Sequence, residues 1–339
     1  MAVTGIGIVS PLGATAEEHW RRVVAGERAG RWLPELSDGL PATPAASWMH
    51  WCGAPPRGWP PCPEPGVLNR LARVATADCL AGAGSEAIDS VPPERRGCII
   101  GVSKPALTAP PGEPRNLSAD ALDAGGAAAL EIAAAYGCEG AVSTPAAACA
   151  TGLVSLIQGA EWIRRGDGDV ALAGSADWSL APAYLAAYRR LGVLARAGDD
   201  PATACRPFDR DRSGFLVGAG AAILLLEDWD HAERRGASIL AEWLGSALVS
   251  DAASLVDFDP SGETPARAVR DALHRSGLAR PRIDVASLHG TGTLANDRCE
   301  TRGLTAALGE AARSVSCFSL KGSIGHLMGA AGSVETATL

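Results

Sequence analysis

The sequence predicts an α/β protein in which helices cover largely parallel sheets. Short apolar runs typical of buried strands alternate along the chain with stretches whose apolar residues recur at helical spacing. Gly, Pro and Ser mark the boundaries, as at Ser10-Pro11, where the first apolar run ends. The 339 residues suffice for two ordinary domains or for one large domain made of two similar halves.

Most of the expected elements fall in the first two thirds of the chain. Each expected strand is a short apolar run, and each expected helix has its apolar residues on one face. In order, they are a strand at 2–9, helices at 16–24 and 68–83, a strand at 97–102, a helix at 127–136, a strand at 142–144, a helix beginning just after residue 149, and strands at 170–173 and 221–226.

Residues 33–66 interrupt this pattern. They are rich in Pro and Gly and contain Trp48, Trp51 and Trp59, which makes regular structure improbable. We expect a long surface excursion. Its tryptophans could form a contact surface, but we favour their packing onto the excursion's own domain.

The last third repeats the order of elements without repeating the residues. It predicts a strand at 240–249, a helix at 265–276, a strand at 285–288, a helix at 300–308 and a strand at 315–320. We therefore expect two similar halves, at 1–230 and 231–339.

Charge and composition exclude several classes of protein. A net charge of −8 gives no electrostatic reason to expect nucleic acid or an anionic membrane as the main partner. Since the N-terminus has no basic region followed by an apolar stretch, and no apolar run could span a bilayer, we expect a cytoplasmic protein. The nine cysteines form no C-x-x-C pair, so neither a disulfide framework nor a metal site is indicated. Lys104 and Lys321 are the only lysines among 30 basic residues, so a lysine inside a motif stands out.

Three short motifs carry candidate chemistry, and the first surrounds Cys149. Residues 146–152 read AAACATG and lie between an expected strand and an expected helix. A cysteine at the N-terminus of a helix is favoured as thiolate, which makes it a nucleophile. Taken alone, a cysteine among alanines is more often a buried small hydrophobe.

The second and third motifs each follow an expected strand. Residues 288–293 read LHGTGT and place His289 at a strand end, where ligands bind in open α/β sheets. Residues 321–326 read KGSIGH and place Lys321 five residues before His326. A polar or structural turn explains each motif separately, but it does not explain why all three motifs occupy strand ends in one chain.

Together the motifs resemble those of the β-ketoacyl-ACP synthases of the thiolase superfamily, which surround a Cys-His-His triad. The resemblance extends to VTGIG at 3–7, PLG at 11–13 and RPFDRDRSGF at 206–215. It also includes Asp297, Glu300 and Glu335. It implies two βαβαβ-type halves in a layered αβαβα arrangement, commonly as a homodimer, with no cofactor and with substrates carried on the phosphopantetheine arm of acyl carrier protein.

The resemblance also implies roles for the motif residues. Cys149 would accept the acyl group, while His289 and His326 would assist decarboxylation of malonyl-ACP and stabilise the enolate. Lys321 would polarise the site, and Asp297, Glu300 and Glu335 would support it. Thr291 and Thr293 would hold the pantetheine arm. These roles imply a decarboxylative Claisen condensation in fatty-acid or polyketide synthesis.

Two features refine the resemblance. The second histidine favours an elongating enzyme over the initiating type, which has Asn there, and Cys149 in place of Gln differs from inactive chain-length factors. Members of the resembled family continue past the Gly-Ala-Ala-Gly segment with two further strands. Because this sequence ends at Leu339, we expect a truncated C-terminal half. We favour a truncated reading frame over divergence as the explanation.

Two other functions remain open. One is a catalytically impaired subunit that pairs with an active synthase, as a heterodimer. The other is a degradative thiolase, which is disfavoured because such enzymes need a second cysteine near the C-terminus and Cys317 precedes the last motif.

Overall fold

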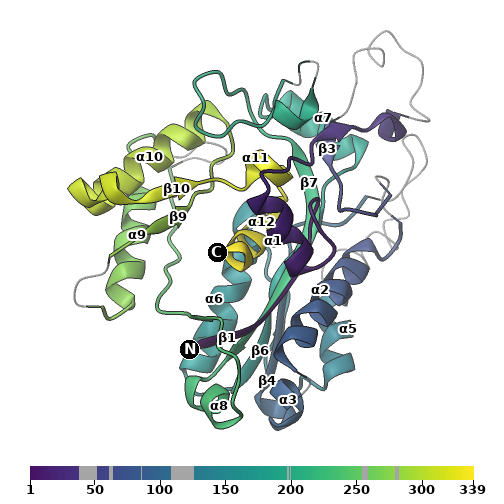
Figure 1. Cartoon of the computed structure of the whole chain (residues 1–339), viewed down its shortest axis with the longest axis vertical. Helices are drawn as coiled ribbons and strands as arrows, with labels where there is room; N and C mark the ends of the chain where they lie inside the picture. Colours follow the sequence, from purple (N-terminus) through teal and green to yellow (C-terminus); the bar gives the residue numbers. More distant parts are fainter. Residues whose placement is uncertain are drawn as a thin grey trace.

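The computed structural model describes residues 1–37, 52–60, 64–84, 86–107, 126–196, 198, 200–253, 259–278 and 282–339. Within these ranges a large sheet of eight strands lies beside a parallel pair of strands (Figure 1). The large sheet contains β1 (Ala2–Val9), β2 (Arg31–Trp32), β3 (Cys52–Ala54), β4 (Arg96–Val102), β5 (Val142–Ser143), β6 (Val170–Trp178), β7 (Val217–Glu227) and β8 (Ala241–Glu242). The pair consists of β9 (Val285–Ser287) and β10 (Ser316–Phe318).

Helices cover both sheets. They are α1 (Ala16–Val24), α2 (Val67–Ala83), α3 (Glu86–Asp89), α5 (Ala127–Tyr136), α6 (Thr151–Arg164), α7 (Pro182–Arg190), α8 (Trp229–Arg234), α9 (Glu263–Arg275), α10 (Leu294–Leu308), α11 (Lys321–Ile324) and α12 (Ala331–Thr338). In Figure 1, α2 and α5 lie on one side of the large sheet, and α6 and α12 lie on the other. The β9–β10 pair lies between α6 and α12 and the outer helices α9 and α10. This is the layered α/β arrangement that the sequence predicts.

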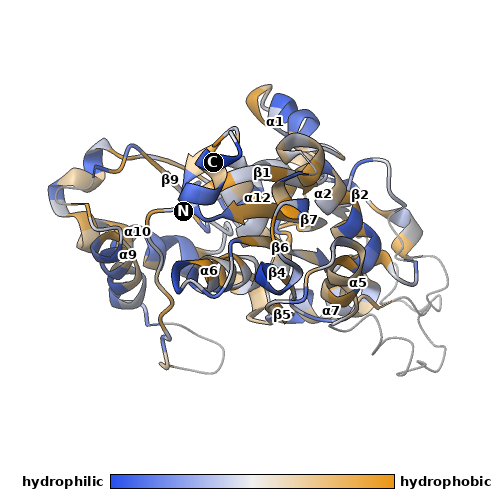
Figure 2. Ribbon diagram, turned by 90° about the horizontal axis from the view of Figure 1, so that it is seen from below, coloured by the Kyte–Doolittle hydropathy of each residue, from blue (hydrophilic) through white to orange (hydrophobic). Residues whose placement is uncertain are grey.

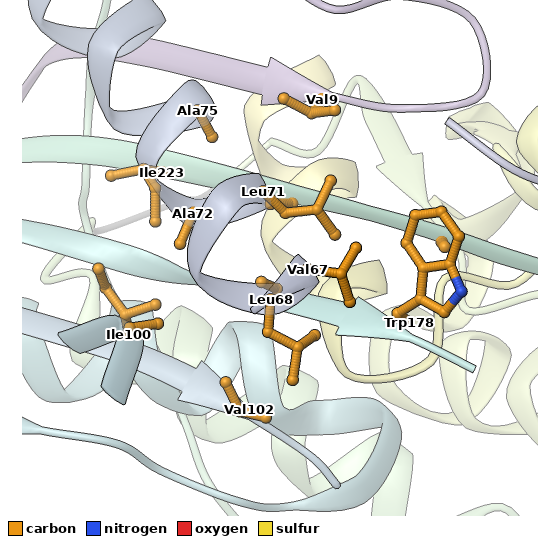
Figure 3. Close-up of a cluster of buried hydrophobic side chains, with 14 of the residues drawn as sticks. Val9, Val67, Leu68, Leu71, Ala72, Ala75, Ile100, Val102, Trp178 and Ile223 are labelled. Atoms are coloured by element: carbon orange, nitrogen blue, oxygen red, sulfur yellow. The ribbon is translucent and has the colours of Figure 1, made fainter. Parts of the chain in front are cut away.

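The core lies on both faces of β6 and β7, in which every residue is buried. Figure 2 shows these strands as hydrophobic ribbons between α2 and α6. On the α2 side, Leu68 and Leu71 project from the helix toward the sheet, as Figure 3 shows. Gly7 permits this packing, since a Cβ there would lie 1.8 Å from the carbonyl oxygen of Ala75 in α2.

The strand directions correct one expectation. β4 runs parallel to β5 and β6, and β3 runs parallel to β7, but β7 is antiparallel to both β1 and β6. The long connection between β6 and β7 starts and ends at the same edge of the sheet, so the chain returns antiparallel. Strand order alone did not reveal this.

Most element boundaries agree with the expected ones, including the helix at 127–136. The strand expected at 240–249 is wrong, because only Ala241–Glu242 pairs with β1 and the next residues are irregular. The helix expected from Glu300 begins earlier, at Leu294, because the Thr293 hydroxyl accepts a hydrogen bond from the Asn296 N–H and caps the helix. The short helices α7, α8, α11 and α12 were not predicted.

The excursion at 33–66 lies partly outside the described residues, which include neither Trp48 nor Trp51. Trp59 is described, and its ring centroid lies 6.3 Å from that of Trp178 at the end of β6. The guanidinium of Arg70 stacks over the same ring at 4.3 Å. Trp59 therefore packs onto its own domain, as favoured, and the other two tryptophans stay a prediction.

Among the described helices, none combines the length and the apolar character needed to cross a bilayer.

Candidate active site

Cys149 lies in a single 3₁₀ turn, Ala148–Ala150, that leads directly into α6. The residue before it, Ala148, has a φ of 47°, in the left-handed region that residues with a Cβ rarely adopt. The Thr151 hydroxyl fixes the turn, since it accepts from the Ala147 N–H at 2.8 Å and donates to the Ala148 carbonyl at 2.7 Å. Backbone strain of this kind concentrates at functional sites and here sets the direction of the Cys149 side chain.

The three motifs meet at this turn. The Cys149 sulfur and one ring nitrogen each from His289 and His326 all lie within 4.8 Å of one another. The two imidazole rings are nearly perpendicular, with centroids 5.2 Å apart. The fold thus brings one sulfur and, from segments at least 140 residues further along the chain, two imidazoles into a common space.

Neighbouring groups fix the tautomer of each imidazole. The Met328 N–H donates to Nδ1 of His326 at 3.1 Å, and the Lys321 ammonium lies 3.3 Å from Nδ1 of His289. Neither neighbour can accept a hydrogen bond through these atoms, so in each neutral ring the hydrogen is on Nε2. Burial lowers the pKa of both histidines well below the usual value, and the Lys321 charge lowers it further. The site therefore holds two neutral imidazoles that each offer an Nε2–H donor.

This tautomer bears on metal binding. Cys149, His289 and His326 are residue types that ligate metals, and their donor atoms are close enough to share an ion. A metal-ligating histidine normally donates its other N–H to an acceptor, which leaves the ligating nitrogen free of hydrogen. Here the second nitrogen of each ring faces a donor. The arrangement therefore suits stabilisation of negative charge on a substrate better than coordination of a metal.

The protonation of Cys149 differs from the expectation. Burial raises the pKa of its thiol, while the charges of Lys321 and Lys104 act in the opposite direction. The thiolate that a helix N-terminus was expected to favour is thus not the resting form. The sulfur must lose its proton during attack.

Lys321 belongs to a buried ion pair. Its side chain is 1% exposed, and its ammonium donates to the Glu335 carboxylate of α12 as well as facing His289. Burial raises the pKa of Glu335, and Lys321 opposes that shift. Lys321 therefore lies between His289 and Glu335, and the polarising and supporting roles expected of the two residues stay predictions.

Asp297 and Glu300 hold the loop that carries His289. Glu300 accepts hydrogen bonds from the backbone N–H groups of His289 at 2.5 Å and Gly290 at 2.8 Å. Asp297 accepts from the N–H groups of Gly292 at 3.2 Å and Phe208 at 2.8 Å. Both carboxylates project from α10 and accept hydrogen bonds from the loop after β9, and their supporting role in the site stays a prediction.

Thr291 and Thr293 lie in the same loop. Their hydroxyl oxygens are 2.9 Å apart, and that of Thr293 also caps α10. Their predicted contact with a pantetheine arm stays a prediction.

Sequence reasoning missed three residues beside the triad. The ring of Phe215 makes an edge contact with that of His326, with centroids 5.0 Å apart. Lys104 and the fully buried Asp177 form an ion pair at 3.1 Å, and both influence the Cys149 thiol electrostatically. The scarcity of lysine was a signal for Lys104, because both lysines of the chain act on this thiol, but nothing in the sequence paired it with Asp177.

A half-buried nucleophilic sulfur at a strained turn, facing two neutral N–H donors, defines an acyl-transfer site in a layered α/β fold. The family descriptions "Beta-ketoacyl synthase, N-terminal domain" and "Beta-ketoacyl synthase, C-terminal domain" match residues 66–232 and 240–339. The granaticin polyketide putative β-ketoacyl synthase 1 of Streptomyces violaceoruber is 33% identical over 99% of this chain and 84% of its own. The 3-oxoacyl-[acyl-carrier-protein] synthase 2 of Mycobacterium tuberculosis (strain ATCC 25618 / H37Rv) is 39% identical over 58% of this chain and 46% of its own.

Solved structures agree with these relatives. A type II polyketide ketosynthase, AntDE, solved with its acyl carrier protein AntF, superposes with a TM-score of 0.87 at 27% identity, over 99% of this chain and 84% of that one. A β-ketoacyl synthase from Burkholderia phymatum STM815 gives 0.82 at 28% identity, over 99% and 84%.

The chain belongs to the β-ketoacyl synthase family of the thiolase-like superfamily. It is an acyltransferase-type condensing enzyme of fatty-acid or polyketide synthesis. Enzymes of this family need no metal or small cofactor, because their substrates are carried on the phosphopantetheine of acyl carrier protein.

Proposed function

We propose that Cys149, His289 and His326 carry out a decarboxylative Claisen condensation, in which Cys149 holds the acyl chain and the two imidazoles act on malonyl-ACP. The observation that carries this proposal is the meeting of the sulfur and two ring nitrogens within 4.8 Å. Such a distance lets a bound thioester touch all three groups at once.

In the first half-reaction, the Cys149 sulfur attacks the carbonyl carbon of the acyl thioester on the carrier. A bond forms between that carbon and the Cys149 sulfur, and the bond to the pantetheine sulfur breaks. Because burial keeps the Cys149 thiol protonated at rest, its proton ends on the departing pantetheine thiolate. The carrier leaves as a free thiol.

In the second half-reaction, malonyl-ACP loses carbon dioxide. The electron pair of the broken bond forms an enolate, whose oxygen accepts hydrogen bonds from Nε2–H of His289 and His326. The enolate carbon then attacks the acyl carbonyl on Cys149, a carbon–carbon bond forms, and the sulfur leaves and regains a proton from water. Loss of one such donor lowers rates by about a hundredfold to a thousandfold in comparable sites.

Lys321 keeps the imidazoles in the form that this step requires. Its ammonium faces Nδ1 of His289 and disfavours protonation of both rings. Glu335 balances the buried charge of Lys321. An imidazolium in place of a neutral ring would protonate the enolate carbon, which would give acetyl-ACP and end the condensation.

The proposed partner is an acyl carrier protein. A surface hollow of about 670 Å³ beside Thr293 is lined by Arg196, Arg206 and Arg212, which suits the phosphate of a pantetheine arm and an acidic carrier. The related AntDE structure contains such a carrier. We place the pantetheine arm along Thr291 and Thr293 on this basis.

We also propose, from the family alone, that the protein forms a homodimer or a heterodimer with a second ketosynthase. On the same basis we propose a cytoplasmic location. The division into halves at 1–230 and 231–339 is also a proposal, supported by the two family matches at 66–232 and 240–339.

The test is a condensation assay with acyl-ACP and malonyl-ACP that follows carbon dioxide release and the β-ketoacyl product. We expect product from the wild type, none from Cys149→Ala, and product formed about a hundredfold to a thousandfold more slowly from His326→Ala. Glu310→Ala, on an exposed side chain, serves as the control. Equal product from Cys149→Ala would refute the proposal, and product formed only with a second ketosynthase would favour the impaired-subunit alternative.

A further inference from the structure

A second buried ion pair lies on the other side of the triad. Lys104 follows β4, and Asp177 lies near the end of the neighbouring strand β6. The Lys104 ammonium donates to the Asp177 carboxylate at 3.1 Å and to the Ser103 hydroxyl at 2.9 Å. The side chain of Asp177 is 0% exposed and that of Lys104 21% exposed, so the pair is shielded from water.

Asp177 connects this pair to the segment after His326. The Asp177 oxygen that Lys104 contacts also accepts from the Gly329 N–H at 3.2 Å. Gly329 follows Met328, whose N–H donates to Nδ1 of His326. Met328 has a φ of 46°, in the left-handed region, so the turn needs external contacts to hold this conformation.

The turn leaves little freedom around these contacts. A Cβ on Gly329 would lie 2.6 Å from the Ser103 Cβ, so the turn packs directly against the loop that carries Lys104. The backbone of His326 itself is held against β7, since its carbonyl accepts from the Gly218 N–H at 2.8 Å and its N–H donates to the carbonyl of Leu216, just before the strand, at 2.6 Å. Among the residues that the structure describes, the Met328 N–H is the hydrogen-bond partner of Nδ1 in the His326 ring.

From this geometry we propose that Lys104 and Asp177 are positioning residues for His326. Asp177 anchors the Met328–Gly329 turn, and Lys104 forms the ion pair that holds the buried Asp177 side chain in place. The anchored turn keeps Nε2–H of His326 directed at the reacting oxygen. The role rests on the proposed function of His326 in the condensation.

Electrostatics adds independent support. Burial opposes the charge of Lys104, yet Asp177 and neighbouring groups raise the pKa of Lys104 above its usual value, so the ammonium stays charged. Lys104 lowers and Asp177 raises the pKa of the Cys149 thiol. Removing both charges together therefore removes two effects of opposite sign on the nucleophile, and the rate of Cys149 alkylation measures what remains.

The test uses the double variant Lys104→Met with Asp177→Ala, which removes the acceptor for the Gly329 N–H and leaves no unpaired charge buried. Its matched control is Arg95→Met with Asp169→Ala, since that ion pair, with a nitrogen–oxygen distance of 2.5 Å, joins the opposite ends of the same two strands. Three quantities are measured in the full chain: the His326 tautomer by ¹⁵N NMR of labelled histidine, kcat for condensation, and the rate of Cys149 alkylation by iodoacetamide.

In the double variant we expect loss of the Nε2–H signal of His326 and a fall in kcat of at least about tenfold, with Cys149 alkylation within about threefold of wild type. Lys104→Arg, which keeps the charge, should retain both the signal and kcat. The control pair should retain them as well. If the double variant folds poorly, Gly329→Ala displaces the same turn from the other side and should give the same signature.

Retention of the tautomer and of kcat in the double variant would overturn the inference and leave the pair a stabilising contact only. Loss of both in the control pair would overturn it too, because any ion pair on these strands would then act alike. If wild type shows no condensation, the proposed function fails, and the NMR signal still decides whether the pair fixes the ring.

Discussion

Substitution of Glu300 should lower the free energy of unfolding by an amount that follows from the two hydrogen bonds that its carboxylate accepts. Its carboxylate accepts the N–H groups of His289 at 2.5 Å and Gly290 at 2.8 Å. Glu300→Ala removes both acceptors, and each unsatisfied buried donor costs about 1–3 kcal/mol, so the free energy of unfolding should fall by about 2–6 kcal/mol. Glu300→Gln keeps one acceptor and should lose about 1–3 kcal/mol.

Urea unfolding, followed by circular dichroism, measures both variants. Glu310→Ala is the control, because that side chain is exposed and should change the free energy of unfolding by less than about 0.5 kcal/mol. Condensation should fall in Glu300→Ala because the loop carrying His289 is released, while alkylation of Cys149 stays unchanged. A Glu300→Ala protein as stable as the control, or no less stable than Glu300→Gln, would refute the hydrogen-bond reasoning.

Three further predictions concern stability, each measured by urea unfolding. Lys321→Met leaves Glu335 buried without its cation and should lose about 3–5 kcal/mol, most of which Lys321→Met with Glu335→Gln should restore; equal losses would contradict the pairing. Burial lowers the pKa of His19 to about 4, below its value in the unfolded chain. The neutral ring therefore contributes fully to the free energy of unfolding above about pH 6.5, and about 3 kcal/mol of that free energy is lost as the pH falls toward 4. His19→Gln should flatten that dependence, and an unchanged slope would count against it. Gly152→Ala places a Cβ 2.4 Å from the Ser333 nitrogen and should destabilise by about 1–3 kcal/mol, whereas an unchanged midpoint would show that α6 and α12 can separate.

Elements with strong local patterns could be predicted from the sequence. The helix at 127–136 follows from its alanine-rich run, and the strand at 2–9 from an apolar run closed by Ser10-Pro11. Residues 240–249 mimic a strand because they are apolar, yet only two of them find a partner strand. Pairing depends on distant residues and is invisible in a local pattern.

Some features of the site could likewise be predicted from the sequence, and others could not. Cys149, His289 and His326 were found because each lies in a short motif at a strand end, and the structure brings them together. The tautomers could not be predicted, because they depend on a backbone N–H and an ammonium that the fold places against the rings. The Lys104–Asp177 pair joins segments 73 residues apart and has no local signature.

The most direct test of the account is the acyl-enzyme itself. The wild-type protein is mixed with acyl-ACP alone, digested, and examined by mass spectrometry for the acylated peptide. We expect the acyl mass on Cys149 in the wild type. It should be retained in His289→Ala and His326→Ala, because transfer to sulfur does not need the enolate donors, and absent in Cys149→Ala. Acylation of another residue at the same rate, or of Cys149→Ala as well as wild type, would contradict the central claim.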